Sequence, residues 1–403
     1  MAEKGKSPFY PGQPVPVELF VGRQREIERI LERGVGQVQR GKPVAMFIEG
    51  DYGIGKSSIA NYLQFIAAER HKLLPIYVSL SGKRTQQELA AAILEATVRG
   101  GLFATTRLER LRSWFAKYLP AKLSIAGLQL DLDKLRADSQ AISSELSLLG
   151  FLEETQRRGR EDGIDGVFLV LDEINGVANE AWFAHFLKGL VDTNARSRTP
   201  VPLLLMLCGV AERRRQLIAN HQPIDRIFDV VEIAAMSAAE SREFFERAFD
   251  QVGIKLSSGV ADELARFSAG FPKIMHIIGD WAYWQDDDGV IDEFDAAYAL
   301  ANAAEDVGKR YVEQQVYAAL RSPDYRSILA KLGEVGPDAM VFKKGELSAK
   351  LTDGERKKLN NFLQKMKKLN VLRSGDHMGE YVFNHPMVRF YIYLSHLQAL
   401  EKR

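Results

Sequence analysis

Short apolar runs alternate with amphipathic stretches through the first half of this 403-residue chain. Helical spacing of apolar positions predicts helices at residues 25–33, 58–66 and 85–99. Runs typical of buried strands lie at residues 44–49, 73–80, 166–171 and 203–207, and a last one lies at 230–233. Strands that alternate with helices in this way indicate a parallel sheet covered on both faces. The predicted fold class is therefore α/β.

Two segments interrupt this pattern. Residues 1–19 hold four of the chain's 14 prolines, which favours an extended N-terminal arm. Residues 100–160 have the character of an insertion. Alternating polarity around a glycine predicts a small hairpin at residues 122–132 there, and a polar helix is expected to follow up to about Arg158.

The strand pattern ends near Met236. Helices are predicted at residues 237–252, 259–267, 272–284 and 294–320. The first opens on a capping box formed by Ser237 and Glu240. The acidic run at residues 286–288, which ends at Gly289, is interpreted as a solvated turn rather than a metal site.

The pattern changes again after Pro323. Helices predicted at residues 325–331, 344–351 and 354–369 precede two strands, at 371–373 and 381–383, that a glycine turn separates. Three short helices and a hairpin are typical of a winged helix-turn-helix. The predicted organisation is an arm at 1–19, an α/β core at 20–235, a helical segment at 236–317 and a winged helix domain at 318–403.

The chemistry is concentrated in one glycine-rich stretch. Residues 50–57, Gly-Asp-Tyr-Gly-Ile-Gly-Lys-Ser, fit the phosphate-loop pattern G-x-x-x-x-G-K-[ST] in full. A predicted strand precedes the stretch and a predicted helix follows it, which is the context that the motif requires. The glycines permit positive φ and close backbone approach to phosphate oxygens. Lys56 should reach the β- and γ-phosphates of a nucleotide, and Ser57 should ligate Mg²⁺.

A phosphate loop needs a carboxylate for its magnesium. Asp172 lies at the C-terminal end of the apolar run 166–171, where ligand sites of open parallel sheets form. We expect it to anchor Mg²⁺ directly or through water. Glu173 follows directly and is positioned to orient and deprotonate an attacking water.

The motifs together resemble the AAA+ superfamily of P-loop ATPases. The resemblance rests on Phe20-Val21-Gly22-Arg23, the phosphate loop, Leu171-Asp172-Glu173 and Gly270-Phe271-Pro272-Lys273, and it covers roughly residues 16–320. It is nearest to the archaeal and bacterial ATPases that lie between origin initiators and the signalling STAND ATPases. The resemblance implies an AAA+ core, a helical lid at 236–317 and ATP with Mg²⁺ as ligands.

The resemblance also implies the residues that contact the nucleotide. The backbone of Val21 would contact the edge of the adenine base. Alternatively, Phe20–Arg23 is only the segment that precedes the next helix. Cys208 lies where the family often has a polar sensor of the γ-phosphate, and cysteine is a weak donor, so that role stays open. The implied nucleotide-binding set is Val21, Gly22, Gly50, Asp51, Tyr52, Gly53, Ile54, Gly55, Lys56, Ser57, Ser58 and Lys273.

Two basic residues have roles that the resemblance leaves open. Arg226 lies where the family uses an arginine finger on a neighbouring subunit's nucleotide, and it equally suits a structural arginine paired with Asp225 or Asp229. The cluster at residues 212–215 offers competing arginines. Lys273 lies at the start of a helix of the lid, where initiators have an arginine. A lysine keeps the positive charge of that arginine but cannot form its bidentate hydrogen bonds.

Composition limits the remaining possibilities. The net charge is only +1, so a surface for nucleic acid must be local. The single cysteine, Cys208, cannot form an intrachain disulfide, which fits a reducing compartment. No apolar run is long enough for a membrane span and no secretory signal opens the chain, so a soluble cytoplasmic protein without a membrane partner is expected.

A local basic field lies near the C-terminus. Residues 340–375 hold ten Lys or Arg against three Asp or Glu, a net charge of +7. A field of this strength suits phosphate-backbone binding. The helix at 354–369 would be the recognition element. The predicted DNA contacts are Lys344, Arg356, Lys357, Lys358 and Lys368.

The sequence therefore predicts an ATP-hydrolysing AAA+ switch with Glu173, Lys56 and Arg226 as catalytic residues. Nucleotide state would control assembly into a homo-oligomer and DNA binding. A STAND-like signalling or defence ATPase, whose terminal domain binds protein instead of DNA, is the competing hypothesis. A transporter or metabolic kinase would need an acceptor site, and nothing in the sequence suggests one.

Overall fold

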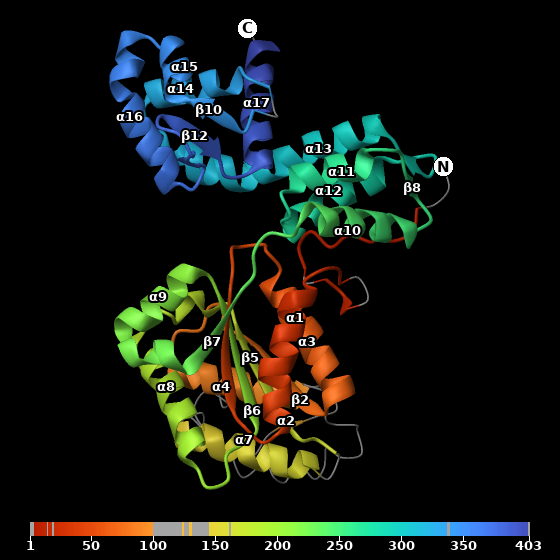
Figure 1. Cartoon of the computed structure of the whole chain (residues 1–403), viewed down its shortest axis with the longest axis vertical. Coiled ribbons are helices and arrows are strands. Elements are labelled where there is room, and N and C mark those ends of the chain that lie inside the picture. The colour runs from red at the N-terminus through yellow and green to blue at the C-terminus, as the bar shows by residue number, and fades with distance from the viewer. Residues whose placement is uncertain are drawn as a thin grey trace. The chain divides into compact units, whose positions relative to one another are not determined.

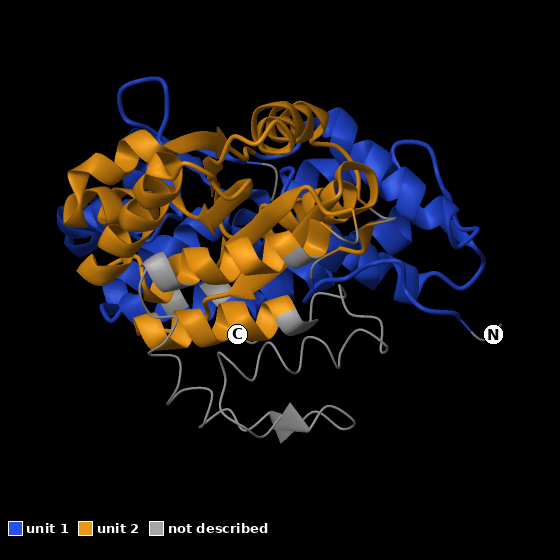
Figure 2. Cartoon of the chain, turned by 90° about the horizontal axis from the view of Figure 1, so that it is seen from below, with its two compact units in different colours: residues 1–13, 235–403 blue, residues 14–234 orange. Residues whose placement is uncertain are grey.

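The computed structural model describes residues 4–13, 15–17, 20–99, 123–124, 129–130, 145–160, 163–336 and 339–401. The chain divides into two compact units (Figure 2). We call Pro14–Ala234 the sheet unit, and Met1–Gln13 together with Ala235–Arg403 the helical unit. The predicted arm is therefore divided, because residues 1–13 belong to the helical unit and the arm from Pro14 on belongs to the sheet unit.

The sheet unit is built on a parallel sheet. In the described residues its strands follow the order β2-β5-β6-β1-β7, and each neighbouring pair is parallel. The bounds are β1 Val44–Glu49, β2 Leu73–Ser79, β5 Gly166–Asp172, β6 Leu203–Gly209 and β7 Phe228–Glu232. All five predicted strands are confirmed. The central strands β5 and β6 are buried along their whole length, as strands covered on both faces must be.

Helices cover both faces of this sheet (Figure 1). Alternate residues of β6, such as Leu203 and Leu205, pack in one core with α4, α7, α8 and α9. The opposite face meets α3 and the helical stretch after Phe20, where a Cβ on Gly34 would lie 2.9 Å from the Met46 sulfur. The helix bounds are α1 Gln24–Ile30, α2 Gly36–Gln39, α3 Lys56–His71, α4 Gln86–Arg99, α7 Glu145–Arg160, α8 Ala181–Arg196 and α9 Ala211–Asn220.

One expectation for the predicted insertion is wrong. Helix α7 is not polar all round, because Phe151 and Leu152 are fully buried in the core beside α8. The hairpin is confirmed where it is described, since β3 (Leu123–Ser124) pairs antiparallel with β4 (Gln129–Leu130). The other residues between 100 and 144 lie outside the described ranges.

The first part of the helical unit consists of α10 Ala238–Asp250, α11 Val260–Ser268, α12 Pro272–Gln285 and α13 Glu293–Val307. The predicted capping box is confirmed, because Ser237 and Glu240 bond to each other's backbone N–H groups. Helix α13 continues into a π-helix at Gly308–Tyr317. Strands do not disappear after Met236 as expected, because β8 (Lys255–Leu256) pairs in parallel with β9 (Val290–Ile291).

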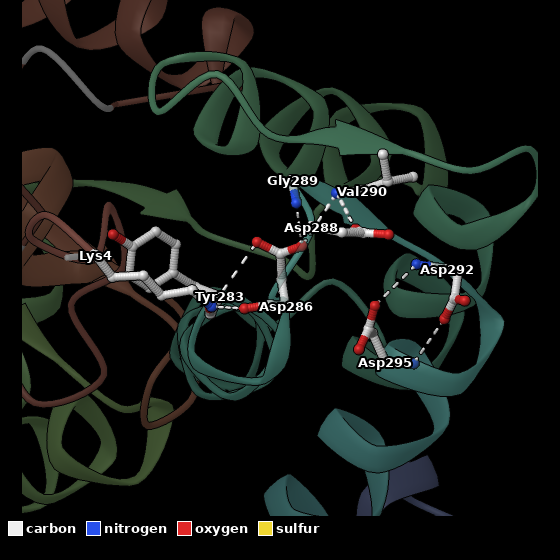
Figure 3. Close-up of polar contacts among 8 residues, drawn as sticks. All are labelled: Lys4, Tyr283, Asp286, Asp288, Gly289, Val290, Asp292 and Asp295. Carbon is white, nitrogen blue, oxygen red and sulfur yellow. Dashed lines mark hydrogen bonds and ion pairs between the residues drawn. The ribbon is translucent and has the colours of Figure 1, made fainter. Parts of the chain in front are cut away.

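The acidic turn after α12 is only partly solvated. Asp286 is 4% exposed, and its carboxylate accepts the backbone N–H groups of Gly289 and Val290 at 2.8 and 3.0 Å (Figure 3). Lys4 of the arm donates to the backbone carbonyl of Tyr283 at 2.6 Å and forms an ion pair with Asp286. The turn is therefore stabilised by its own carboxylate and by the arm.

The arm packs through one aromatic side chain. Phe9 is 4% exposed, and its ring lies 5.0 Å from that of Phe249, centroid to centroid. A Cβ on Gly279 would lie 2.2 Å from the Phe9 ring, so the glycine makes room for it. The Tyr10 N–H donates to His276 Nδ1 at 3.1 Å. The prediction of an extended arm did not include this packing.

The C-terminal part contains α14 Pro323–Gly333, α15 Lys344–Ala349, α16 Asp353–Lys368 and α17 Pro386–Glu401. An antiparallel sheet in the order β10-β12-β11 joins them, with β10 Val341–Lys343, β11 Leu372–Ser374 and β12 Glu380–Phe383. The sequence predicts β11 and β12 but not β10. Buried Glu355 of α16 accepts from Lys331 of α14 at 2.6 Å, which fixes one helix against the other.

Candidate active site

The glycine-rich stretch forms the turn between β1 and α3. Gly53 and Gly55 have φ values of 77° and 97°, which L side chains rarely adopt. A Cβ on Gly50 would lie 2.8 Å from the backbone oxygen of Ile233, so this position has no room for a side chain. The turn directs the N-terminus of α3 toward the C-terminal edge of the sheet, where the positive end of the helix dipole attracts anions.

Lys56 crosses this turn. Its Nζ donates to the backbone oxygens of Gly50 and Asp51, both at 2.8 Å. Burial lowers the pKa of Lys56, and the nearby carboxylates of Asp172 and Asp51 oppose that shift. An ammonium group has three donors, so Lys56 can keep both carbonyls and still donate to an anion at the loop.

Ser57 and Asp172 are brought together as the sequence predicts. The Ser57 hydroxyl donates to Asp172 Oδ2 at 2.5 Å. Asp172 is 2% exposed at the end of β5. A second hydroxyl, that of Tyr77 on β2, donates to the same oxygen at 2.5 Å. Burial and the neighbouring Asp172 raise the pKa of Tyr77, which remains protonated at neutral pH.

Glu173 lies directly beyond this pair, with its side chain exposed. Its φ is 55°, an unusual value for a residue other than glycine. Its backbone N–H donates to Asp172 Oδ1 at 2.7 Å, and its Oε2 accepts the Ser79 hydroxyl at 2.8 Å. The left-handed backbone therefore directs the Glu173 carboxylate away from Asp172 and toward the end of β2.

Sequence reasoning missed Tyr77 and Ser79. The two residues lie two positions apart on β2 and so share one face of the sheet. Ser79 pairs in register with Asp172, and Tyr77 pairs with Val170. The sequence does show two hydroxyl side chains near the end of a predicted strand. They could be assigned to the site only if that strand was known to lie next to the one that carries Asp172.

The stretch before α1 is tied to the glycine turn by Arg23. This arginine is 5% exposed, and its guanidinium donates to the backbone oxygens of Ala234 and Ile54, the second at 3.2 Å. Phe20 stacks on Tyr62 of α3 at 4.6 Å. Val21 and Gly22 are half-buried, and their contact with an adenine stays a prediction. This bracing role of Arg23 is not evident from the sequence alone.

The other predicted nucleotide contacts differ in exposure. Tyr52 is 66% exposed and its ring lies 5.7 Å from Lys56 Nζ, whereas Ile54 is 2% exposed. Ser58 accepts the Val15 N–H at 3.3 Å. Cys208 is fully buried within β6, and burial together with Asp172 raises the pKa of its thiol. A buried, protonated thiol is a poor sensor of a phosphate outside the sheet.

Arg226 is exposed at the end of a 3-10 helix, Gln222–Ile227. Among the described residues it has no ion pair, because Asp225 pairs with Arg214 at 2.9 Å and Asp229 pairs with Arg29 at 2.8 Å. The described residues therefore show no pairing of Arg226 with either aspartate, and both roles of Arg226 stay predictions. Arg214 also forms an ion pair with Glu49 at 2.6 Å, so its contacts link residues within the sheet unit.

The remaining predicted residues belong to the helical unit. Lys273 is the second residue of α12 and is exposed, and its contact with nucleotide stays a prediction. Two of the five residues predicted to bind DNA are engaged within the unit, because Arg356 pairs with Asp353 at 2.9 Å and Lys358 pairs with Asp324. Lys357 and Lys368 are exposed on α16, and Lys344 is half-buried at the start of α15.

The donors around Ser57 fit magnesium. They are the Ser57 hydroxyl and the Asp172 carboxylate, which are hard oxygen ligands. Among the described side chains, no cluster of three or more His, Cys, Asp or Glu could by itself hold a metal ion. Mg²⁺ suits such a site, because it usually binds through one or two protein oxygens together with substrate phosphates and water.

Comparisons with known proteins agree with this fold. The chain is similar to a Walker-type ATPase of Pyrococcus abyssi, with 18% identity, a TM-score of 0.51, and coverage of 93% of this chain and 96% of that one. It is also similar to the ORC2 protein of Aeropyrum pernix, solved as ADPNP-ADP complexes, with 12% identity, a TM-score of 0.56, and coverage of 94% and 95%. These likenesses show the fold, a P-loop α/β fold of the AAA+ type.

No curated protein matches the chain in sequence. Within the described ranges, every helix is too short or too polar to serve as a transmembrane span. A family profile described as AAA ATPase domain matches residues 19–219, which include the glycine turn, Tyr77, Asp172 and Glu173. Over these residues the chain is therefore similar to AAA ATPase domains.

Proposed function

We propose that the protein binds ATP with Mg²⁺ at the Gly50–Ser57 turn and hydrolyses it. The observation that carries the proposal is the hydrogen bond between Ser57 and Asp172, at 2.5 Å. It joins the last residue of the phosphate loop, which follows β1, to a carboxylate at the end of β5, a strand that β6 separates from β1. This is the pair of oxygen donors that a magnesium-nucleotide site needs.

Each residue of the site has a distinct task. The backbone N–H groups at the start of α3 bind phosphate oxygens, and Lys56 neutralises the β- and γ-phosphates. Ser57 and Asp172 would hold Mg²⁺, which supplies charge neutralisation as phosphoryl transfer proceeds. Glu173 Oε2 accepts a proton from the attacking water, which then adds to the γ-phosphorus as the bond to the β-phosphate oxygen breaks.

Arg226 fits a role in trans. Its guanidinium is exposed, and both nearby aspartates are paired with other arginines. An arginine that reaches the nucleotide of a neighbouring subunit stabilises the charge that develops in the transition state. Hydrolysis would then depend on assembly into a homo-oligomer. Lys273, at the start of α12, would report nucleotide state to the lid.

The output would be DNA binding through the C-terminal part. Its helices and antiparallel sheet follow the order of a winged helix, with α16 as the recognition element. An exposed stripe of α16 consists of Lys357, Asn361, Gln364 and Lys368. Lysines at both ends suit phosphates, and the two amides between them suit base edges.

A protein-binding output, as in a STAND-like signalling or defence ATPase, is the second candidate. The ion pairs Arg356–Asp353 and Lys358–Asp324 favour it, because they weaken the basic field that DNA binding requires. Titration of duplex DNA with the full chain, in MgATP and in MgADP at several salt concentrations, separates the two. Salt-dependent binding that changes with the nucleotide supports the DNA switch, and background affinity at physiological salt supports the protein partner.

The nucleotide half of the proposal has its own test. Labelled ATP should bind more tightly to the full chain with Mg²⁺ than with a chelator. Asp172→Ala should abolish that difference while weak binding without metal persists. An ATP affinity that changes neither with Mg²⁺ nor in Asp172→Ala would overturn the assignment of this site.

A further inference from the structure

We propose that Tyr77 is a positioning residue for the carboxylate that anchors magnesium, so that it sets the affinity of the site for Mg²⁺. The inference rests on the proposed function of the Ser57–Asp172 pair. It concerns a residue on β2, the strand next to the one that carries Asp172.

The sheet register places Tyr77 within reach of Asp172. Tyr77 pairs with Val170 on β5, two residues before Asp172 on the same face. A diagonal neighbour on a sheet lies within reach of an aromatic side chain. The Tyr77 hydroxyl accordingly meets Asp172 Oδ2 at 2.5 Å, from the β2 side, while Ser57 approaches the same oxygen from α3.

The hydrogen bonds of Asp172 leave one acceptor direction open. An ionised carboxylate offers about four lone-pair sites, two on each oxygen. Oδ2 uses both of its sites, for Ser57 and Tyr77. Oδ1 uses one for the Glu173 N–H, at 2.7 Å. The remaining site is on Oδ1, and it is the one available to a metal ion or to its bound water.

Tyr77 thereby sets the rotation of the carboxylate. The Glu173 N–H contact is made by the adjacent residue, so it moves with the local backbone. Ser57 has a second task, because its oxygen would ligate the metal. Tyr77 is the donor that comes from a separate strand, β2. Hydrogen-bond partners that orient a metal-binding group commonly change metal affinity by about 10–100-fold when they are removed.

The test uses Tyr77→Phe in the full chain, because phenylalanine keeps the ring and removes only the hydroxyl. Binding of labelled ADP is measured by fluorescence during a Mg²⁺ titration and again with a chelator. We expect the Mg²⁺ concentration that gives half of the maximal increase in ADP affinity to be about tenfold higher than in the wild type. The ADP affinity measured in chelator should be unchanged. Tyr298→Phe is the matched control, because the Tyr298 ring is 46% exposed on α13.

The Asp172→Ala background provides the second arm. There, Tyr77→Phe should have no further effect on the Mg²⁺ dependence, since the hydroxyl acts through the carboxylate. An unchanged Mg²⁺ midpoint in Tyr77→Phe, or an equal loss of ADP affinity with and without Mg²⁺, would overturn the inference. A wild-type chain whose ADP binding ignores Mg²⁺ would instead overturn the proposed function, so the two failures are distinguishable.

Discussion

The Ser57 hydroxyl donates to the Asp172 carboxylate at 2.5 Å, although 115 positions separate the two residues in the sequence. One lies at the start of α3 and the other at the end of β5. Both elements meet at the C-terminal edge of the parallel sheet, where open α/β folds form their ligand sites. The same edge carries Lys56 and Glu173, so binding and hydrolysis can be tested one residue at a time.

Lys56→Ala should weaken ATP binding by roughly 10–100-fold. The ammonium group supplies charge-assisted hydrogen bonds of about 1.5–3 kcal/mol, and alanine supplies none. Equilibrium binding of labelled ATP measures the effect. Lys42→Ala, at an exposed position before β1, is the control and should bind as the wild type does. Equal affinity in Lys56→Ala and the control would contradict the assignment of the loop.

The arm should contribute to the stability of the helical unit. Phe9→Ala removes a buried ring from the cluster with Phe249, and we expect a loss of about 3–5 kcal/mol in unfolding free energy. Gly279→Ala should also destabilise the unit, because its Cβ would lie 2.2 Å from the Phe9 ring. Denaturant unfolding measures both variants.

The two arm variants should also be coupled. Once Phe9→Ala has removed the ring, Gly279→Ala has nothing to displace, so the double variant should lose less stability than the two single losses combined. Phe294→Ala, at a side chain that is 85% exposed, is the control and should change stability by less than about 0.5 kcal/mol. Additive losses would indicate that the arm does not pack against Gly279.

The helical unit should lose stability as the pH falls from about 6.5 toward 4. Burial lowers the pKa of His276 from 6.5 to about 4, so the folded state favours the neutral ring. Its contribution is complete above pH 6.5 and is lost through this window, because the unfolded chain takes up the proton first. Between pH 7 and pH 5 the loss from His276 should be on the order of 2 kcal/mol.

Comparison with His276→Gln isolates this effect. An amide oxygen can still accept the Tyr10 N–H but does not titrate, so the variant should lose less stability between pH 7 and pH 5 than the wild type. His377→Gln, at an exposed position, should keep the wild-type pH dependence. If both variants behave alike, His276 does not carry the acid sensitivity.

DNA binding should depend on the ends of the exposed stripe on α16. Each of Lys357→Ala and Lys368→Ala should weaken duplex binding and reduce the slope of log affinity against log salt by about 0.9, as expected for one lost phosphate contact. Lys255→Ala removes the same charge at an exposed position of β8 and should leave the slope unchanged. Unchanged slopes in the two α16 variants would remove these lysines from the interface.

The glycine motif and Asp172-Glu173 were predictable because each combines a short motif with the apolar run beside it. The strands were predictable because a sheet covered on both faces needs continuous apolar segments such as Gly166–Asp172. Tyr77 was not predictable, since its role depends on β2 lying next to β5, and strand order is a tertiary property. Strand β10 was missed because Val341–Lys343 is short and has exposed ends.

The arm shows another limit of sequence reasoning. Prolines favour extended backbone, and residues 4–13 of the arm contain no helix or strand. The pattern could not indicate where the arm would pack, because Phe9 meets residues more than 230 positions later in the chain, among them Phe249 and Gly279. The ion pairs of Asp225 and Asp229 were equally out of reach, because the arginines that bind them come from α9 and α1.

Single-turnover hydrolysis of ATP by Glu173→Gln tests the central claim most directly. Glutamine keeps the size of the side chain but cannot accept the proton of the attacking water. The variant should bind labelled ATP as the wild type does and release phosphate roughly 10²–10⁴ times more slowly. Glu180→Gln, at an exposed position before α8, should turn over normally. Phosphate release by Glu173→Gln at the wild-type rate would contradict the account.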